Sequence, residues 1–130
     1  MAIVTAMIPA GFGPEKKARF ISETKNALCE AFDLIPMAIS LWVQEYEPEN
    51  MCPDAAKKRV LIVYTTEGKP DEQKNKVGQL FDQVCGDVFG EQKGDTFVIF
   101  KEHPNSNVCA RGVLKTMDPK PPINPYRSQQ

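Results

Sequence analysis

The sequence predicts an α+β fold of two tandem β-α-β units, which form a four-stranded sheet with two helices on one face. Three observations lead to this fold class. Residues recur at offsets of 56 or 57 positions along the 130-residue chain. Each copy contains two short apolar segments typical of strands, and between them lies a segment with helical periodicity. Because β-α-β crossovers are right-handed, a pseudo-twofold axis can join two such units into one sheet.

The recurrence is carried by six residue pairs. Three pairs are 56 residues apart (Pro14 and Pro70, Cys29 and Cys85, Pro48 and Pro104), and three are 57 apart (Gly11 and Gly68, Asn50 and Asn107, Cys52 and Cys109). All four cysteines thus fall into repeat-related pairs, which favours packing over a redox or metal role. We expect one domain over residues 1–115, with repeats of about 1–56 and 57–115, and an extended tail over 116–130. The tail carries four of the 11 prolines, Pro119, Pro121, Pro122 and Pro125.

The first repeat begins with a short apolar strand over residues 3–9. Gly11 and Gly13 then turn the chain, and Pro14 suits the first position of a helix. Residues 38–43 form a second strand that we expect to be buried on both faces, and residues 47–50 end it. The expected core-facing side of the helix carries Ala18, Ile21, Leu28 and Phe32.

The second repeat shows the same order more clearly. Residues 60–64 read as a buried strand and residues 67–70 as a turn. Pro70, Asp71 and Glu72 open a helix, because acidic side chains are favoured at the positive end of the helix dipole. Residues 96–100 form the fourth strand, which ends by Pro104. The helix has a continuous apolar stripe of Val77, Leu80, Phe81, Val84, Cys85 and Val88.

With both helices on one side, the opposite face of the sheet needs a cover. A second copy of the chain is the simplest cover, so the sequence predicts an oligomer. The residues expected on this open face include several of Val4, Ala6, Leu61, Val63, Val98 and Phe100.

Composition narrows the function classes. The net charge of −1 and the pI of about 5.9 give no electrostatic footprint for nucleic acid or an anionic membrane. No apolar run reaches the ~20 residues of a membrane span, and the N-terminus has no secretory signal pattern. We therefore expect a cytoplasmic protein with reduced thiols. With one histidine, His103, and no pair of cysteines at metal-ligand spacing, no metal or cofactor is expected.

Three segments together resemble the tautomerase superfamily. They are residues 67–74 (EGKPDEQK) after the third strand, residues 102–107 (EHPNSN) with the later Gly112, and residues 45–48 (EYEP). Within the superfamily they are most similar to the branch around cis-3-chloroacrylic acid dehalogenase, over roughly residues 1–115. The resemblance implies a homotrimer with its pocket near the N-terminus and a subunit interface.

The family chemistry that this resemblance implies depends on an N-terminal proline, and the sequence departs from it. Met1 stands at the proline position, followed by Ala2. Leu28 replaces a helix histidine, Thr66 and Lys69 stand at two arginine positions, and Ile99 and Ala110 replace a tyrosine and a glutamate. The resemblance therefore implies the scaffold without the dehalogenase or hydratase machinery, since fold alone does not fix function. Apolar Leu28, Ile99 and Ala110 favour a bulkier, less acidic substrate.

Two cations are candidates for binding a substrate acid group. Lys69 follows a strand and precedes a helix, where free backbone N–H groups also attract an anion; the alternative is a solvated lysine in a turn. Arg111 can replace the charge lost at Thr66, or it can form a surface ion pair.

The candidate catalytic groups are the N-terminal amine, His103 and Cys109. The amine belongs to Met1, or to Ala2 after methionine removal, and can act as a base or form a Schiff base. His103 can act as an acid or base, although a lone histidine before a proline is more often a turn residue, and Cys109 is a nucleophile only with a stabilised thiolate. These residues favour a divergent enzyme acting on a small carbonyl or enol metabolite, as an isomerase, lyase or cyclase. The alternatives are a non-catalytic member that binds a ligand or protein, and a ferredoxin-like binding domain.

Overall fold

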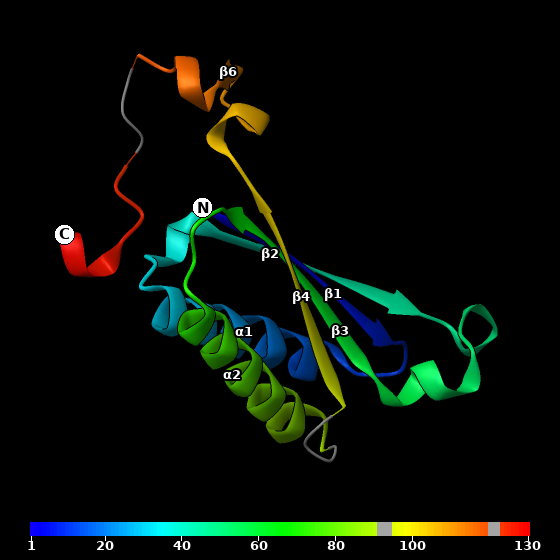
Figure 1. The fold of residues 1–130 in the computed structure, drawn as a ribbon. Helices are drawn as coiled ribbons and strands as arrows, with labels where there is room; N and C mark the ends of the chain where they lie inside the picture. Colours follow the sequence, from blue (N-terminus) through cyan, green and yellow to red (C-terminus); the bar gives the residue numbers. More distant parts are fainter. Residues whose placement is uncertain (91–94, 120–122) are drawn as a thin grey trace.

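The computed structural model describes residues 1–90, 95–119 and 123–130 (Figure 1). The strands are β1 (Ala2–Pro9), β2 (Ile39–Tyr46), β3 (Arg59–Thr66), β4 (Thr96–His103), β5 (Cys109–Ala110) and β6 (Val113–Leu114), and the helices are α1 (Pro14–Phe32) and α2 (Asp71–Phe89). Short 3-10 helices lie at Pro36–Ala38, Pro48–Asn50, Pro53–Lys57, Asn105–Asn107, Lys115–Met117 and Arg127–Gln129.

The main sheet has the strand order β2-β1-β3-β4. β1 pairs with β2 and β3 pairs with β4 in parallel, whereas the central pair β1 and β3 is antiparallel. Both helices cover the same face of this sheet (Figure 1). Each parallel pair with its helix is one β-α-β unit, so the predicted fold class is confirmed.

The two units share one register. Each element of the second unit begins 57 residues after its counterpart, as Ala2 of β1 and Arg59 of β3 show. Cys52 and Cys109 are therefore equivalent, but Cys29 and Cys85 are one residue out of register. The prediction of two equivalent cysteine pairs is thus wrong for the helical pair. Both helical cysteines are nevertheless buried, because adjacent positions on the inner side of a helix can both face the core.

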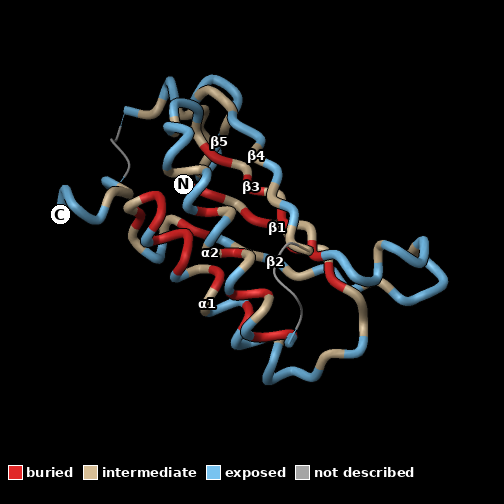
Figure 2. Tube along the Cα trace, turned by 60° about the horizontal axis from the view of Figure 1, so that its bottom comes forward, coloured by how far each residue is buried: buried red, intermediate tan, exposed pale blue. Residues whose placement is uncertain are grey.

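The core lies between the helices and one face of the sheet (Figure 2). Burial alternates strictly along β1 and β3, and the buried positions include Val4, Ala6, Leu61 and Val63. The sequence analysis assigned these residues to the open face, and that assignment is wrong; Val98 and Phe100 also pack against the core. Both central strands are apolar on both faces, so the alternation could not decide which side meets the helices.

Two further expectations need correction. β2 is an edge strand, and its Trp42 is 57% exposed, so it is not buried on both faces. Ala18 and Ile21 of α1 are exposed, whereas Leu28 and Phe32 are buried as expected. Phe20 and Thr24 take the inner positions in this part of the helix instead. A single polar residue at an inner position, Thr24, concealed this face. The apolar stripe of α2 is confirmed, with Leu80 half-buried at its margin.

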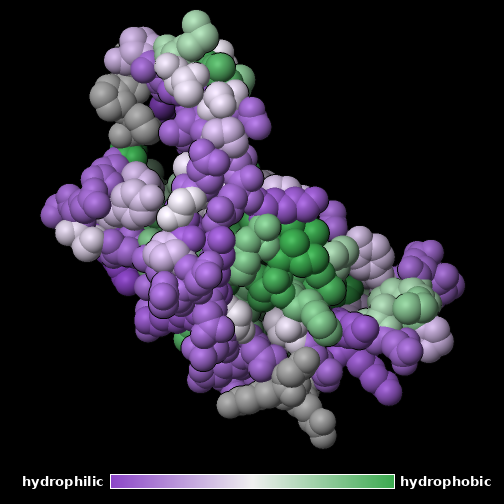
Figure 3. Space-filling view, in the orientation of Figure 1, coloured by the Kyte–Doolittle hydropathy of each residue, from purple (hydrophilic) through white to green (hydrophobic). Residues whose placement is uncertain are grey.

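The open face of the sheet carries the other set of side chains. Trp42, Phe97 and Ile99 are its large exposed apolar residues, and Ile99 lies beside Ile62 across the β3–β4 pair. The space-filling view shows a hydrophobic patch over the sheet (Figure 3). Uncovered apolar surface of this kind marks an interaction site, which agrees with the expected oligomer.

The C-terminal tail returns to the end of α1. Leu34 forms an isolated antiparallel bridge with Tyr126, and the Ile35 N–H donates to the carbonyl of Pro125 at 2.8 Å. Residues 127–129 form a 3-10 turn, so this part is not simply extended. The expected extended chain at Pro121 and Pro122 lies outside the described residues. Across the described ranges, neither helix is long and apolar enough to cross a membrane.

Candidate active site

The N-terminus lies where β1 begins and β3 ends. Ala2 is opposite Thr65 in the register, and the Thr65 hydroxyl donates a 3.4 Å hydrogen bond to the backbone carbonyl of Met1. The next residue, Thr66, is paired with His103 at the end of β4. The antiparallel β1–β3 pair and the parallel β3–β4 pair thus bring Met1, Thr66 and His103 to one end of the sheet.

The N-terminal amine is surrounded by protein and by positive charge. Burial, and to a smaller extent the nearby charges of Lys115 and Lys69, together lower the pKa of the Met1 amine from the ordinary 8.0 to about 6. Each of the three causes disfavours the protonated form. At neutral pH this amine is therefore mainly a neutral base, a state that an ordinary chain terminus reaches only at higher pH.

Lys69 is held in the turn between β3 and α2. The turn needs Gly68, whose φ of +101° favours glycine, and Pro70 caps the helix that follows. The Lys69 ammonium lies 5.6 Å from the centroid of the Phe32 ring and 5.7 Å from that of Tyr126. Two aromatic faces therefore fix this cation near the N-terminus, in contrast to a freely solvated lysine.

Asp33 anchors the tail that carries Tyr126. Asp33 ends α1 in the left-handed conformation, with φ of 55°, and its carboxylate accepts hydrogen bonds from the backbone and hydroxyl of Ser128. The Arg127 N–H also donates to the Asp33 carbonyl at 2.7 Å. These bonds position the Tyr126 ring against Lys69.

His103 has one ring nitrogen without a partner. Its Nδ1 is buried and has no hydrogen bond within the described residues, while its carbonyl accepts from the Glu67 N–H at 3.0 Å. The neighbouring Glu102 forms a 2.9 Å ion pair with Lys74. The hydrogen bond from Lys74 is the main cause that lowers the pKa of the Glu102 carboxyl. Glu102 and His103 are consecutive residues of β4, so their side chains point to opposite faces of the sheet.

The candidates Cys109, Ala110 and Arg111 lie in the short β5–β6 hairpin. Arg111 and Gly112 both have positive φ, of 54° and 81°, as a two-residue hairpin turn with the native strand twist requires. Arg111 is exposed and pairs with Asp118 at 3.4 Å. Cys109 is exposed, and Ala110 is half-buried. The hairpin brings a different cation, Lys115, to the amine.

Two apolar candidates lie on opposite sides of the sheet. Leu28 of α1 is fully buried in the core, and Ile99 is 48% exposed on the open sheet face. Ile99 belongs to the surface that an oligomer would cover.

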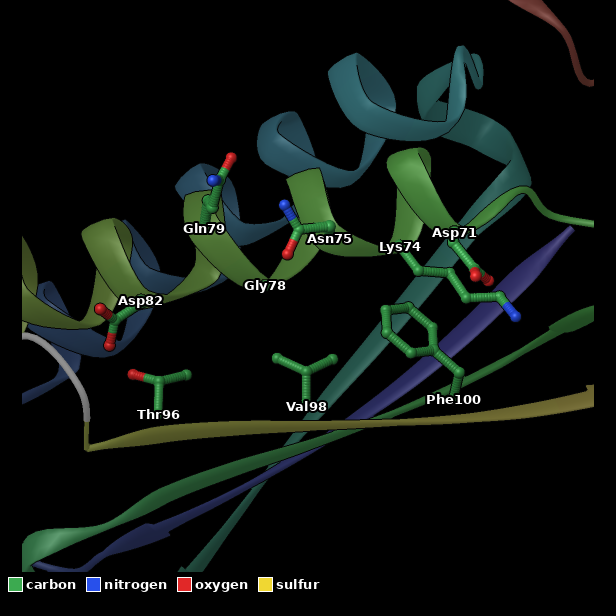
Figure 4. Close-up of a pocket in the computed structure, with 9 residues that line it drawn as sticks. All are labelled: Asp71, Lys74, Asn75, Gly78, Gln79, Asp82, Thr96, Val98 and Phe100. Atoms are coloured by element: carbon green, nitrogen blue, oxygen red, sulfur yellow. The ribbon is translucent and has the colours of Figure 1, made fainter.

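One hollow of the surface is lined by other residues. An open groove of about 690 Å³ runs between α2 and β4 (Figure 4). Thr96, Val98 and Phe100 extend toward the helix from the strand, and Lys74 lies at one end of the groove. Its lining includes no candidate from the sequence. Across the described part of the chain, no cluster of three or more metal-binding side chains occurs.

The sequence analysis missed Lys115 and Tyr126. The available signal for Lys115 was its place in the sequence, because it is a charged residue just after a hairpin that turns the chain back toward the N-terminus. Tyr126 gave none, because only the fold of the tail brings it to Lys69.

Comparisons with known proteins agree with this architecture. A family model described as tautomerase enzyme matches residues 60–117. No curated protein matches the chain by sequence.

Three of the similar solved structures illustrate the likeness of the fold. A fused 4-OT wild-type asymmetric trimer has a TM-score of 0.81 and 20% identity, covering 88% of this chain and 96% of that chain. Pt0534 inactivated by 2-oxo-3-pentynoate has a TM-score of 0.81 and 18% identity, covering 89% and 99%. Malonate semialdehyde decarboxylase has a TM-score of 0.74 and 16% identity, covering 85% and 92%.

At these sequence identities, the solved structures are evidence for the fold alone. Their topology is that of the mixed four-stranded sheet with its two helices, and the family match lies in the second β-α-β unit and the hairpin after it. These findings support the tautomerase superfamily, and the chain has the tautomerase fold.

Proposed function

We propose that this chain is a divergent enzyme of the tautomerase superfamily, near the cis-3-chloroacrylic acid dehalogenase branch, that acts on a small carbonyl or enol metabolite. Its N-terminal amine is the acid–base group, without the parental proline. The observation that carries the proposal is the position of this amine, half-buried at the end of β3 and near Lys69 and Lys115, which lowers its pKa to about 6. A base with a pKa near the working pH is well matched to proton transfer.

The chemistry follows from the charges. The neutral amine takes a proton from the carbon next to the substrate carbonyl, and the C–H electron pair forms the double bond of an enolate. The enolate oxygen becomes negative and is stabilised by a lysine ammonium. The protonated amine then returns the proton to another atom of the substrate, which completes an isomerisation. A lysine ammonium favours this step because it attracts the developing enolate oxygen more strongly than the neutral carbonyl oxygen of the bound substrate.

Lys69 is the proposed anchor for an acidic group of the substrate. It stands at the start of α2, where the helix dipole adds partial positive charge. The half-buried Tyr126 presents an aromatic face beside it, which suits a substrate with an apolar body. Thr66 and Ala110 are proposed to line the same site, and His103 and Cys109 remain predictions.

We also propose that the active form is a homotrimer. The open sheet face carries Trp42, Phe97 and Ile99, and the fused 4-OT structures are described as trimers. Ile99 joins the substrate site in this proposal only through the subunit interface.

A proton-exchange assay tests the proposal. The probe is 2-oxo-4-phenylbutanoate in D₂O, with loss of the proton signal at carbon 3 followed by NMR. We expect enzyme-dependent exchange that falls ~10²- to 10⁴-fold when the N-terminal amine is acetylated. Lys69→Ala should weaken binding of the probe by about 1.5–3 kcal/mol, the size of a charge-assisted hydrogen bond, while Lys69→Arg keeps most of it. Intact mass shows whether Met1 or Ala2 carries the amine.

The matched control is Lys76→Ala. Lys76 is also on α2, but it pairs with Glu30 at 3.5 Å on the helix surface, so exchange should be unchanged. Saturable binding of the probe without exchange would favour the non-catalytic member instead. The departures at Met1, Ile99 and Ala110 also predict no useful turnover of 3-haloacrylates.

A further inference from the structure

A cavity lies at the other end of β1 from the candidate active site, at a place related to that site by the internal symmetry of the chain. This cavity of about 320 Å³ lies between the ends of β1 and β2, the loop over residues 47–58 and the start of β3. Figure 1 shows this loop at the far end of the sheet from the N-terminus. Its volume falls in the lower range of small-molecule sites.

The pocket occupies, in the first repeat, the place of the candidate active site in the second. The 57-residue register relates four of its lining residues to four sequence candidates: Lys58 to Met1, Pro9 to Thr66, Tyr46 to His103, and Cys52 to Cys109. An ammonium group on a side chain thus replaces the N-terminal amine. The polar positions Thr66 and His103 correspond to less polar residues, so this pocket is an apolar counterpart of the active site.

Its lining combines an apolar wall with one cation. Met7 and Met51 supply flexible thioether side chains that adapt to varied apolar shapes. Lys58 carries the positive charge, and Asn50 adds an amide donor. None of the described residues that line the cavity is acidic, so the charge of the lining is positive.

The lysine is held at the border of the pocket. Its ammonium lies 5.4 Å from the centroid of the Phe97 ring, and Phe97 is paired with Val60, another lining residue. The Lys58 carbonyl accepts a 2.9 Å hydrogen bond from the guanidinium of Arg59, which is itself buried. Fixing both the backbone and the side chain reduces the entropy lost when an anion binds.

We propose that this pocket binds a small monocarboxylate with an apolar body, independently of the N-terminal site. The carboxylate pairs with the ammonium of Lys58 and the amide of Asn50, and the apolar body lies along Met7 and Met51. This occupant matches one positive charge at the border of an otherwise apolar cavity.

Methionine-methyl NMR tests the proposal with octanoate as the probe. Met7 and Met51 line the pocket, whereas Met37 and Met117 are 71% and 74% exposed elsewhere. In the ¹³C-methyl-methionine protein, octanoate should cause saturable shifts at Met7 and Met51 only. Lys58→Met should weaken this binding about tenfold, because it removes the one cation of the lining, an exposed lysine. Lys57→Met, the adjacent exposed lysine outside the lining, should leave it unchanged, and 1-octanol should bind more weakly than octanoate.

A second measurement needs no variant. Cys52 and Cys109 are both exposed and occupy equivalent positions, so octanoate should slow the alkylation of Cys52 by iodoacetamide but not that of Cys109. Absence of saturable shifts at Met7 and Met51 overturns the proposal. So does equal weakening by Lys57→Met and Lys58→Met, or protection of Cys109 in place of Cys52.

Discussion

The ammonium of Lys69 lies 5.7 Å from the centroid of the Tyr126 ring, so the C-terminal tail forms part of the surroundings of the candidate active site. The tail reaches this position through the bridge between Leu34 and Tyr126 and through the carboxylate of Asp33. A segment outside the two repeats therefore helps to position a proposed substrate anchor.

The first prediction concerns this contact. Tyr126→Ala removes one of the two aromatic faces beside Lys69 and should lower the free energy of unfolding by about 1–2 kcal/mol. Tyr126→Phe keeps the ring face and should stay near wild type, with urea unfolding as the measurement. Equal losses in the two variants would assign the effect to the hydroxyl and contradict a role for the ring.

The second prediction concerns the open sheet face. Light scattering should give a trimer for the wild-type chain, and Ile99→Lys should dissociate it, because a charge then enters the apolar patch around Ile62. Met37→Lys is the matched control, since Met37 is more exposed than Ile99 but lies in the 3-10 turn before β2. A stable wild-type monomer at micromolar concentration would remove the argument for the trimer.

The third prediction concerns a buried arginine. Arg59 is 1% exposed and its guanidinium carbon lies 5.4 Å and 5.1 Å from the ring centroids of Phe12 and Phe89. It also donates hydrogen bonds to the carbonyls of Ala56 and Lys58. Burial is the main cause that lowers the pKa of this guanidinium, yet arginine stays charged in proteins.

Arg59→Ala should therefore lower the free energy of unfolding by about 3–5 kcal/mol, since it leaves a cavity and unsatisfied carbonyls. Arg59→Lys should recover little, because lysine lacks the planar fork of donors. Arg19→Ala, at an exposed pair with Glu23, should change stability by less than about 0.5 kcal/mol. A loss for Arg59→Ala as small as the Arg19 loss would contradict this account of the buried arginine.

Much of the fold could be predicted because several of the repeated residues are ones that turns require. Gly11 and Gly68 both have positive φ and are structural equivalents, as are Cys52 and Cys109. The sequence could not predict which face of the strands meets the helices, because β1 and β3 are apolar on both faces. Only packing against α1 and α2 decides which face is buried. The N-terminal position of the site followed from the resemblance, whereas Lys115 and Tyr126 depend on a hairpin and a tail whose paths local sequence does not specify.

The lowered pKa of the amine also predicts how stability depends on pH. The folded chain has the pKa of about 6 and an unfolded chain the ordinary 8.0, so between these values the unfolded chain binds more protons. The free energy of unfolding should therefore rise as pH increases through this window. This contribution is complete above pH 8 and is lost as pH falls to 6.

The most direct test of the central claim is the titration of the N-terminal amine itself. Trace acetylation at a series of pH values, with the N-terminal peptide quantified by mass spectrometry, gives its midpoint. The account predicts a midpoint of about 6, and a higher midpoint in Lys69→Met and Lys115→Met, because each variant removes a positive charge that disfavours protonation. Lys57→Met, at the far end of the sheet, should leave the midpoint unchanged. A wild-type midpoint near the ordinary 8.0 would contradict the proposal that this amine is the base.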